Sequence, residues 1–497
     1  MHAFRDLTRT AAFGCALSLL AGCGGGGGSG PGPQQPAPTP APTPTPNGNT
    51  CASISSHGRR PAMAAKGGIV PNQLYVTYRQ TGGTAQSIDS TSRSTRSFDL
   101  TPKAGVSHRA ITLPAGVDAA TVAARLRATA GVIDVAPVHT RTPLQVVNVN
   151  DPAFNNYDQW YLFKTNATPG GWSYAPDGTG IDIAIIDTGA DLTNTDLASK
   201  IHYKESVLNG VISTASASVQ DTNGHGTNTA GLAAAATDND YGFASTGYNA
   251  GLQIYNIFPP ATATSDCQTA ATSDEALAIN DAVSHGASVI SMSLGAPPDG
   301  GNNFDHGEDD AVEAAISAGV TVVAAAGNEY ATGQGPSPDY PAAYPGVIAV
   351  GASSAIDNGT MAYLGITSEA VASYSNSGPT LVAPGGDPPS DMDNDYLHWV
   401  EGYSTTTAAY QPDQCTNSLY YGDTICRALF AGTSQATPQV SGTIALMMAY
   451  HGGGARSLSP ATVTTLLTST ADNIGQPTAR QGAGRLNVGN AVAAAHP

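Results

Sequence analysis

The sequence predicts an α/β fold for the larger, C-terminal part of this 497-residue chain. Two apolar runs, residues 181–189 and 320–328, each have the pattern of a buried parallel strand that ends in a glycine turn and a polar residue. An alanine-rich helical segment follows His225, and a long apolar helical segment follows Ser434. Buried strands that alternate with such helices indicate a mostly parallel central sheet with helices on both faces.

Residues 1–23 have the pattern of an export signal. Arg5 and Arg9 precede an apolar run, residues 11–21, which has the length of a signal peptide rather than of a membrane span. The run ends in Leu-Ala-Gly-Cys, which resembles a bacterial lipobox with Cys23 as the lipid-carrying residue. An ordinary cleavage site with an incidental cysteine is the alternative.

The lipobox resemblance implies that the protein is anchored to a membrane of the cell envelope by N-terminal acyl chains. Gly24 follows Cys23, whereas an aspartate there would indicate retention in the inner membrane of a Gram-negative bacterium. We therefore expect the outer membrane, or release to the exterior after processing.

Residues 24–67 are predicted to be a disordered tether. Five consecutive glycines are followed by repeated Pro-Thr and Pro-Ala-Pro steps, a composition that cannot bury a core. We expect the tether to hold a folded body away from the lipid bilayer.

Residues 68–147 are predicted to form a small α+β unit. Residues 73–78 alternate like a strand, residues 118–130 have the apolar spacing of a helix, and residues 132–138 have the pattern of a returning strand.

The larger part of the chain carries an acid, a histidine and a serine in the order of one known type of catalytic triad. Asp187 ends a predicted buried strand, His225 stands between two glycines at a helix entry, and Ser434 lies in Gly-Thr-Ser just before a helix. Asn328 ends the second buried strand and can supply an amide donor. Each residue alone is as easily a cap, loop or turn residue; the combination is what points to catalysis.

Together these four segments resemble the subtilisin-like serine proteases, or subtilases (peptidase family S8), over residues 148–497. The resemblance implies that Asp187 orients the imidazole, His225 acts as general base and then acid, and Ser434 is the nucleophile. It assigns the oxyanion hole to Asn328 and the Ser434 N–H. Two positions depart from the family pattern, because Asn228 stands where a second histidine is usual and Gln435 where a methionine is usual.

The small unit resembles the inhibitory propeptide that precedes subtilase domains, which implies a ferredoxin-like α+β fold and a self-inhibited zymogen. The cleavage junction is then expected between residues 141 and 150. A retained accessory domain is the alternative.

Charge favours the propeptide interpretation. Residues 51–147 contain eleven Lys and Arg against four Asp and Glu, a net charge of +7, whereas residues 148–497 contain seven against 33, a net charge of −26. Opposite fields attract two units in a salt-dependent way. The negative catalytic unit also argues against nucleic acid as a partner, since phosphates would be repelled.

The resemblance also locates the pocket for the substrate residue before the cleaved bond (P1). Its walls are expected around Ser291, Leu294 and Gly295 on one side and Ala325 and Gly327 on the other. An ungapped spacing from Asn328 to Tyr340 places Asp339 at the floor and Glu329 at the rim. A carboxylate there predicts a preference for Arg or Lys at P1; if Asp339 faces solvent instead, the pocket takes large apolar residues.

Residues 385–429 are an acidic, tyrosine-rich insertion before the serine motif. It is expected either to shape the rim of the active site or to be a solvated surface loop. Cys415 and Cys426 lie within it and are expected to form a disulfide in an oxidising compartment. Cys51 and Cys267 are left open, as a pair or as free thiols.

No cofactor is needed for the predicted chemistry. Two interpretations stay open for the acidic residues discussed next: they bind a structural calcium ion, or they form an acidic turn without metal. Asp196, Asp238 and Asp240 stand at positions where calcium-binding subtilases supply oxygen ligands.

The expected partners are therefore protein or peptide substrates, the protein's own propeptide and, through the anchor, a membrane. A protease that processes one partner and a catalytically silent binding protein are the alternative functions.

Overall fold

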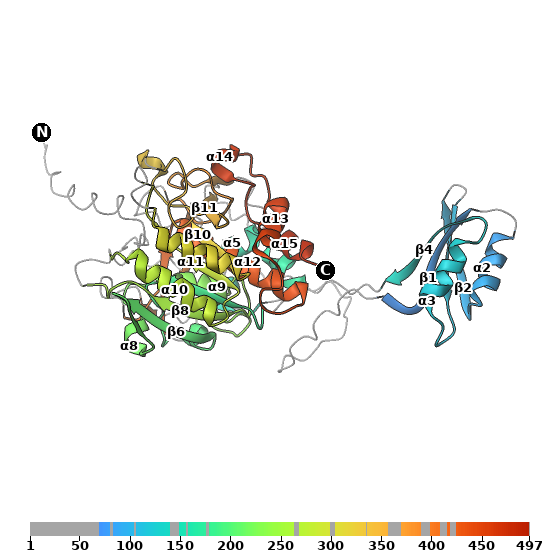
Figure 1. Ribbon diagram of the computed structural model, residues 1–497, viewed down its shortest axis with the longest axis horizontal. Helices are drawn as coiled ribbons and strands as arrows, with labels where there is room; N and C mark the ends of the chain where they lie inside the picture. Colours follow the sequence, from blue (N-terminus) through green and yellow to red (C-terminus); the bar gives the residue numbers. More distant parts are fainter. Residues whose placement is uncertain are drawn as a thin grey trace, which may run out of the picture. The chain divides into compact units, whose positions relative to one another are not determined.

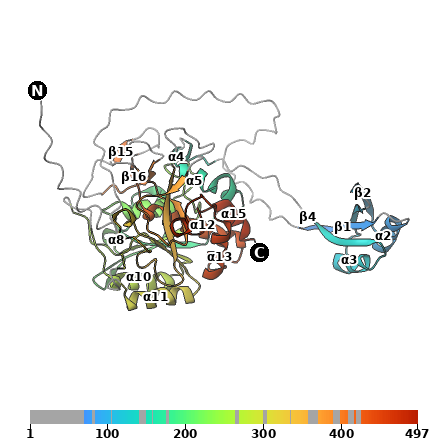
Figure 2. The same ribbon diagram turned by 90° about the horizontal axis from the view of Figure 1, so that it is seen from above.

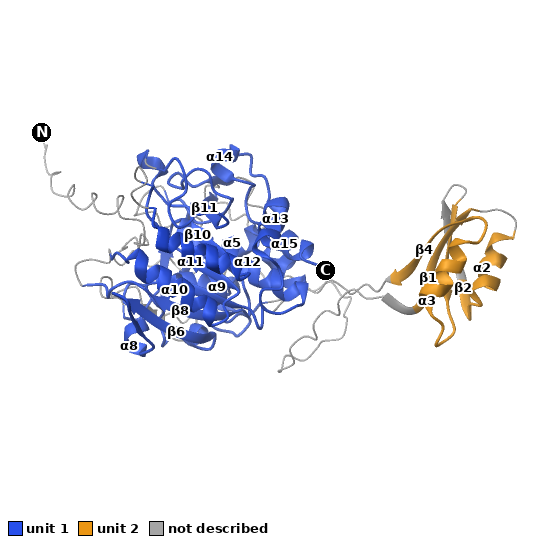
Figure 3. Cartoon of the chain, in the orientation of Figure 1, with its two compact units in different colours: residues 1–48, 146–497 blue, residues 49–145 orange. Residues whose placement is uncertain are grey.

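The computed structural model describes residues 69–79, 83–103, 106–139, 149–155, 158–174, 178–262, 268–298, 304–333, 335–355, 369–388, 398–407, 415–417 and 424–496. The chain divides into two compact units, residues 49–145 and the remainder, which Figure 3 colours separately. Cys23, Cys51, Cys267, the tether and the expected junction up to residue 148 lie outside the described residues. None of the helices in the described ranges is both long and apolar enough to cross a membrane.

The small unit is a four-stranded antiparallel sheet with two helices. Its elements are β1 (Ile69–Arg79), α2 (Thr84–Ser92), β2 (Arg96–Lys103), β3 (Val106–Thr112), α3 (Ala119–Arg127) and β4 (Val132–His139). The sheet order β2-β3-β1-β4 with this β-α-β-β-α-β sequence is the ferredoxin-like arrangement. Sequence reasoning located β1, α3 and β4 but missed α2 and the β2–β3 hairpin.

Helix α3 shows why the sequence specifies this unit. Asp118 caps it, because its carboxylate accepts hydrogen bonds from the backbone N–H groups of Ala120 and Thr121. Val122 and Leu126, one turn apart, then face the sheet and are fully buried in the core of the unit.

The large unit contains a nine-stranded sheet in the order β12-β11-β10-β9-β5-β8-β6-β7, with β13 also paired to β11. The pairings from β11 to β6, and that of β13, are parallel, while β12 and β7 run antiparallel at the edges. The expected α/β class with a mostly parallel sheet is therefore confirmed. The strands are β5 (Asp182–Asp187), β6 (Ile201–Leu208), β7 (Val211–Ser213), β8 (Gly251–Asn256), β9 (Val289–Met292), β10 (Thr321–Ala325), β11 (Ile348–Ala355), β12 (Glu369–Val371) and β13 (Leu381–Pro384).

Helices cover both faces of this sheet, as Figures 1 and 2 show. Alternate residues of β5 enter two different cores: Ile183 and Ile185 pack on the side of α9 and α12, while Ala184 and Ile186 pack on the side of α10 and α11. The longer helices are α9 (His225–Ala234), α10 (Thr272–Ser284), α11 (His306–Ser317), α12 (Thr433–His451), α13 (Pro460–Thr470) and α15 (Val488–Ala494).

Shorter helical turns connect these elements. They are α4 (Pro152–Asn155), α5 (Trp160–Lys164), η1 (Ala167–Gly171), α6 (Trp172–Tyr174), α7 (Thr195–Ala198), α8 (Ser216–Val219), η2 (Tyr330–Thr332) and α14 (Thr478–Gln481). A separate antiparallel sheet in the order β14-β16-β15 is formed by β14 (Val400–Tyr403), β15 (Cys415–Asn417) and β16 (Thr424–Phe430).

Candidate active site

Asp187 and His225 meet where two elements of the large unit end and begin. Asp187 is the last residue of β5, and His225 is the first residue of α9. The Nδ1 atom of His225 lies 2.8 Å from Oδ1 of Asp187, and the two side chains are only 1% and 2% exposed. The N–H of Thr188 and the hydroxyl of Thr229 also donate to Asp187. Because the carboxylate accepts from Nδ1–H, the Nε2 atom of His225 is left as the proton acceptor.

The environment of His225 favours its protonated form. Burial by itself lowers the pKa of the imidazole, but the charge of the Asp187 carboxylate and its hydrogen bond outweigh burial, so the pKa is raised. An imidazole that gains a proton in this place is stabilised as it forms, which suits a proton shuttle.

Asp221, which sequence reasoning missed, holds the loop that positions His225. Its buried carboxylate accepts from the backbone N–H groups of Asn223, Gly224 and Thr227 and from the hydroxyl of Thr188. The signal was an aspartate four residues before a glycine-flanked histidine, a spacing at which one carboxylate reaches successive N–H groups of a helix entry.

Ser434 is the second residue of α12, which packs against α9, but its hydroxyl is not bonded to His225 in this structure. The Oγ atom donates to the carbonyl of Ser293 at 3.1 Å, while the Ser293 hydroxyl donates to the Ser434 carbonyl at 2.8 Å. The Nε2 atom of His225 is buried without a hydrogen-bond partner. Catalytic hydrogen bonds often tighten only when substrate is bound, and a rotation about χ1 is what redirects a serine hydroxyl.

Asn328 is oriented by the first turn of α12. Its Oδ1 accepts from the N–H and the hydroxyl of Thr433, at 2.9 and 3.0 Å, which leaves the amide Nδ2 free of that pairing. A methyl group placed on Gly432 would lie 3.8 Å from this Nδ2. The amide nitrogen therefore lies beside the chain segment that carries Ser434, as an oxyanion donor must.

A narrow pocket adjoins Ser434. Its lining comprises Leu294, Gly295, Ala325, Gly327, Asn328, Asp339, Thr433 and Ser434, and its volume is about 10 Å³. Five of the six expected wall and floor residues thus line one pocket. Ser291 does not belong to that lining, since it lies within β9 and its hydroxyl is bonded to Ser441. A substrate side chain has to separate the two walls on entering.

Asp339, which lines this pocket, is paired with a second buried carboxyl group, that of Glu329, which was expected at the rim and does not belong to the lining. Asp339 is 1% exposed, and the Nδ2 of Asn376 donates to both Asp339 and Glu329, at 2.9 Å each. Burial first, and the nearby charge of Glu329 second, raise the pKa of Asp339 to about 8. The Asn328 N–H also donates to Glu329, so the carboxyl pair is bonded to the residue that is expected to supply the oxyanion amide.

The two residues that depart from the family pattern, Asn228 and Gln435, are hydrogen-bonded to each other. The Nε2 of Gln435 donates to Oδ1 of Asn228 at 3.1 Å, and Nδ2 of Asn228 donates to the carbonyl of Tyr403. The buried side-chain amides therefore link α12, α9 and β14 to one another.

The residues expected to bind calcium are only partly brought together. Asp196 is buried beside Asp151 and accepts from Asn239 and Tyr403, while Asp238 and Asp240 are exposed. Within the described ranges, no group of three His, Cys, Asp or Glu residues surrounds a metal position. One carboxylate oxygen of Asp151, Oδ1, is nevertheless buried without a partner, and burial raises the pKa of Asp151 to about 7. The other oxygen, Oδ2, accepts from the N–H of Asp238, so a single unused acceptor next to Asp196 is what could contact a cation.

The described part of the insertion is buried along β14, whereas Thr406 and Thr407 after it are exposed. Val400 and Tyr403 of β14 are buried, and the hydroxyl of Thr405 donates to the carbonyl of Asp221. The insertion thus holds the loop that positions His225. Asp391, Asp393 and Asp395 lie outside the described residues, as do the chain segments that flank β15.

The expected disulfide is compatible with the strand register. Cys426 is disulfide-bonded, and the Cα atom of Cys415 lies opposite that of Cys426 in the β15–β16 pairing. Their pairing with each other stays a prediction.

Comparisons with known proteins agree with this geometry. The Subtilase family model matches residues 178–484. The chain is 32% identical to thermitase of Thermoactinomyces vulgaris over 346 residues, which cover 69% of this chain and 98% of thermitase. It is 33% identical to subtilisin DY of Bacillus licheniformis over 63% of this chain and 90% of that protein. A solved protease structure from Pseudoalteromonas arctica PAMC 21717 matches with a TM-score of 0.54 and 25% identity, covering 70% of this chain and 99% of that one.

Proposed function

The chain belongs to the subtilase family and is a serine endopeptidase, and we propose that Asp187, His225 and Ser434 are its catalytic triad. Ser434 attacks the scissile carbonyl while His225 accepts its proton at Nε2. His225 then returns the proton to the leaving amine, and water resolves the acyl-enzyme by the same route. Asp187 holds the ring and stabilises the imidazolium.

The 2.8 Å hydrogen bond between Asp187 and His225 is the observation that carries this proposal. The test is labelling with a fluorophosphonate probe, together with cleavage of an unfolded protein. Wild type should be labelled and active, and Ser434→Ala should be neither. An unlabelled, inactive wild type that is correctly folded would favour a silent binding protein.

For the substrate, we propose a basic residue at P1. The position of Asp339 beside Ser434, with Glu329 as its neighbour, supports this. Burial and the neighbouring Glu329 carboxylate favour the protonated, neutral form of Asp339, and a guanidinium or ammonium group would supply the counter-charge that its ionised form lacks. Such a floor favours a processing protease of narrow specificity over a digestive one. A peptide-library cleavage profile separates them: cleavage at one or two basic sites, or broad cleavage of unfolded protein.

We also propose that the small unit is an inhibitory propeptide and that the enzyme removes it between residues 141 and 150. Its positive charge, opposed to that of the large unit, supports this. Ser434→Ala expressed alone should accumulate as the uncleaved precursor, and normal processing without other proteases would contradict self-cleavage. The free propeptide should inhibit more weakly as salt rises, because exposed charges are screened beyond about 8 Å at physiological ionic strength.

We propose that the protein is located in the cell envelope and anchored there by lipid on Cys23. Labelling with a fatty acid tests this: wild type should take up the label, and Cys23→Ala should not.

A structural calcium ion is proposed at Asp151 and Asp196, where it would supply the positive charge that the two buried carboxylates lack. Chelation should then lower the melting temperature, and Asp151→Asn should reduce that sensitivity. Equal melting temperatures with and without chelator would remove calcium from the proposal.

A further inference from the structure

Three consecutive threonines, residues 405–407, follow β14 in the insertion and contact the loops next to the buried pair of the candidate triad; we call them the threonine clamp. The hydroxyl of Thr405 donates to the backbone carbonyl of Asp221 at 2.8 Å, and the hydroxyl of Thr407 donates to the same oxygen at 2.5 Å. Asp221 lies four residues before His225. Two hydroxyls therefore hold the backbone just before the helix that begins at His225.

Thr406, the middle residue of the clamp, binds the other loop. Its N–H and its hydroxyl both donate to Oδ2 of Asp191, at 2.7 Å each. Asp191 lies four residues after Asp187 and is 1% exposed. Burial by itself raises the pKa of Asp191, but the hydrogen bonds from Thr193 and Thr406 outweigh burial, so the pKa is lowered. The clamp thus binds an ionised carboxylate in the loop after β5.

The residue before the clamp packs directly against the entry of α9. Gly224, which precedes His225, has a φ of +107°, and a methyl group placed on it would lie 2.6 Å from Oγ of Ser404. A side chain does not fit between these two segments, and glycine is what permits the close contact. The segment that carries the clamp therefore restrains the backbone of His225.

The same segment is connected to the nucleophile. The N–H of Ser404 donates to the carbonyl of Cys426 in β16 at 2.8 Å, and β14 pairs with β16 along its whole length. β16 ends at Phe430, four residues before Ser434. One small sheet therefore connects the clamp to the chain that carries Ser434.

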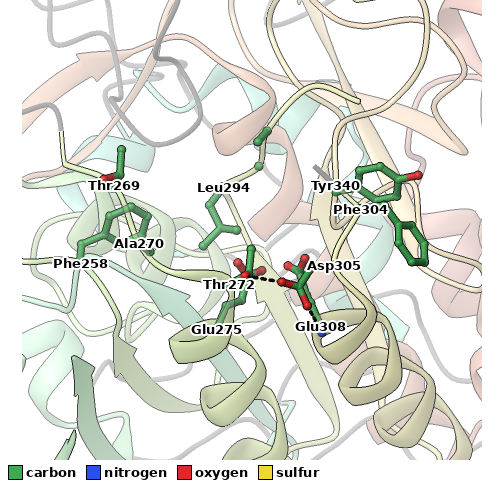
Figure 4. A pocket seen from close by; sticks show the side chains of 12 residues that line it. Phe258, Thr269, Ala270, Thr272, Glu275, Leu294, Phe304, Asp305, Glu308 and Tyr340 are labelled. Atoms are coloured by element: carbon green, nitrogen blue, oxygen red, sulfur yellow. Dashed lines mark hydrogen bonds between the residues drawn. The ribbon is translucent and has the colours of Figure 1, made fainter. Parts of the chain in front are cut away.

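The loop before His225 also has an open neighbour. Asn223 donates to the side chain of Gln268 at 3.0 Å, and the next two residues, Thr269 and Ala270, line a cavity of about 280 Å³ that Figure 4 shows. A cavity supplies no atoms for packing, so it restrains the loop less than a filled core would. The clamp supplies rigidity that this neighbour does not.

We propose that the threonine clamp is a positioning element of the proposed triad, which keeps the imidazole of His225 aligned with Asp187 and with the hydroxyl of Ser434 during turnover. The inference rests on the proposed function and extends it, because none of the three threonines lines the described pocket beside Ser434. The other interpretation is that the clamp only stabilises the fold.

The test compares turnover by enzymes produced from the full chain. Thr405→Val combined with Thr407→Val removes both hydroxyls from the Asp221 carbonyl and nearly keeps the side-chain volume. Well below the melting temperature of this variant, kcat should fall about tenfold with KM within about twofold, because a small misplacement of a catalytic group slows the reaction more than it weakens binding. Thr405→Ser combined with Thr407→Ser keeps the hydroxyls and should hold kcat within about threefold of wild type.

The pH dependence of kcat/KM separates positioning from stability. Burial lowers the pKa of His225, but the charge and hydrogen bond of Asp187 and the charge of Asp221 outweigh burial and raise it. A loop released from the clamp weakens the bond to Asp187, so the pKa of His225 should fall. The acid limb of the profile, which reports this pKa, should therefore move to lower pH in the valine variant and not in the serine variant.

Thr443→Val is the matched control. The hydroxyl of Thr443 is buried and donates to the carbonyl of Gln439 within α12 at 2.8 Å, nine residues beyond Ser434. This variant should have a lower melting temperature but keep kcat and the acid limb. Thr406→Val, at an exposed position, removes only the hydroxyl bond to Asp191 and should lower kcat about threefold.

A valine variant with a lower melting temperature but with unchanged kcat and acid limb would overturn the proposal, as would equal losses in the valine and serine variants. If the valine variant does not fold, Thr406→Val decides, because an unchanged kcat there contradicts the clamp. A folded wild type that a fluorophosphonate probe does not label removes the proposed function as well, whereas a labelled wild type with an unaffected valine variant contradicts the clamp alone.

Discussion

Asp187 and Asp339 are two buried carboxyl groups of the large unit, and their charges are compensated in different ways. Asp187 accepts hydrogen bonds from an imidazole, a backbone N–H and a hydroxyl. Asp339 faces a second carboxyl group, Glu329, and shares with it one amide donor from Asn376. Asp187 therefore has its counter-charge within the protein, whereas Asp339 gains one only from a ligand or a proton. In the proposed function, the carboxylate of the first kind serves the chemistry and that of the second kind selects the substrate.

The largest effect is expected when Asp187 is neutralised, which tests whether this carboxylate acts on the reaction alone. Asp187→Asn keeps the shape but leaves His225 without a charged partner and in the wrong tautomer, so kcat should fall by about 10⁴. Single-turnover kinetics with peptides that carry Arg or Phe at P1 are the measurement. Both substrates should lose activity equally, because Asp187 acts on the reaction and not on the side chain bound. A loss confined to one substrate would show that Asp187 contributes to selection.

Asn328 lines the same pocket as Asp339 and Ser434, so its substitution tests whether the chemistry and the selection of substrate are separable. Asn328→Ala removes one oxyanion donor and should lower kcat by about 10²–10³, with KM nearly unchanged. Thr433→Val is the partner variant, because it removes the hydroxyl that holds Oδ1 of Asn328 but leaves the amide in place. It should lose less activity than Asn328→Ala. An equal loss would mean that the orientation of Asn328, rather than its presence, limits the rate.

Neutralising Asp339 should change selection and leave the chemistry intact. Asp339→Asn should lower the ratio of kcat/KM for P1-Arg over P1-Phe about tenfold, because one charged hydrogen bond is lost, at a cost of roughly 1.5 kcal/mol, the lower end of the usual range. Asp240→Asn, a change of an exposed acid in the same unit, is the control and should leave the ratio unchanged. A wild type that prefers Phe would show that the floor carboxyls do not select a cation.

The same ratio should depend on pH. The pKa of Asp339 is raised to about 8, so the group is protonated and neutral below that value and gains charge as the pH rises through it. The preference for P1-Arg should therefore increase from about pH 6 to about pH 9, by up to about tenfold. The titration of His225 affects both substrates alike and cancels in the ratio. In Asp339→Asn the ratio should be flat, and a ratio that falls with pH in wild type would reverse the assignment.

The smallest expected effect concerns a buried polar pair that has no charge. Gln435→Met leaves the Asn228 oxygen without its donor and should cost about 1–3 kcal/mol of unfolding free energy. Asn228→Leu combined with Gln435→Met removes both polar groups and should be closer to neutral. Thermal unfolding of the single and double variants measures this, and additive losses would show that the two amides do not depend on each other.

The sequence by itself determined the class of fold and the identity of the candidate triad. Asp187, His225 and Ser434 each lie within a short local pattern, in which a buried strand or a helix entry fixes the backbone next to the side chain. Asn328 was found in the same way, at the end of β10. Local backbone preferences act over a few residues and are therefore readable from a single chain.

The tertiary structure alone decided which buried groups meet. Asn376 bridges Asp339 and Glu329 across a separation of 37 and 47 residues in the chain, and Glu275 meets Glu308 because α10 packs against α11. The hydroxyl of Ser434 donates a hydrogen bond to the carbonyl of Ser293 for the same kind of reason, since the two residues are far apart in the chain and are brought together by packing. Such contacts depend on how helices and strands pack, and no periodicity along the chain records that packing.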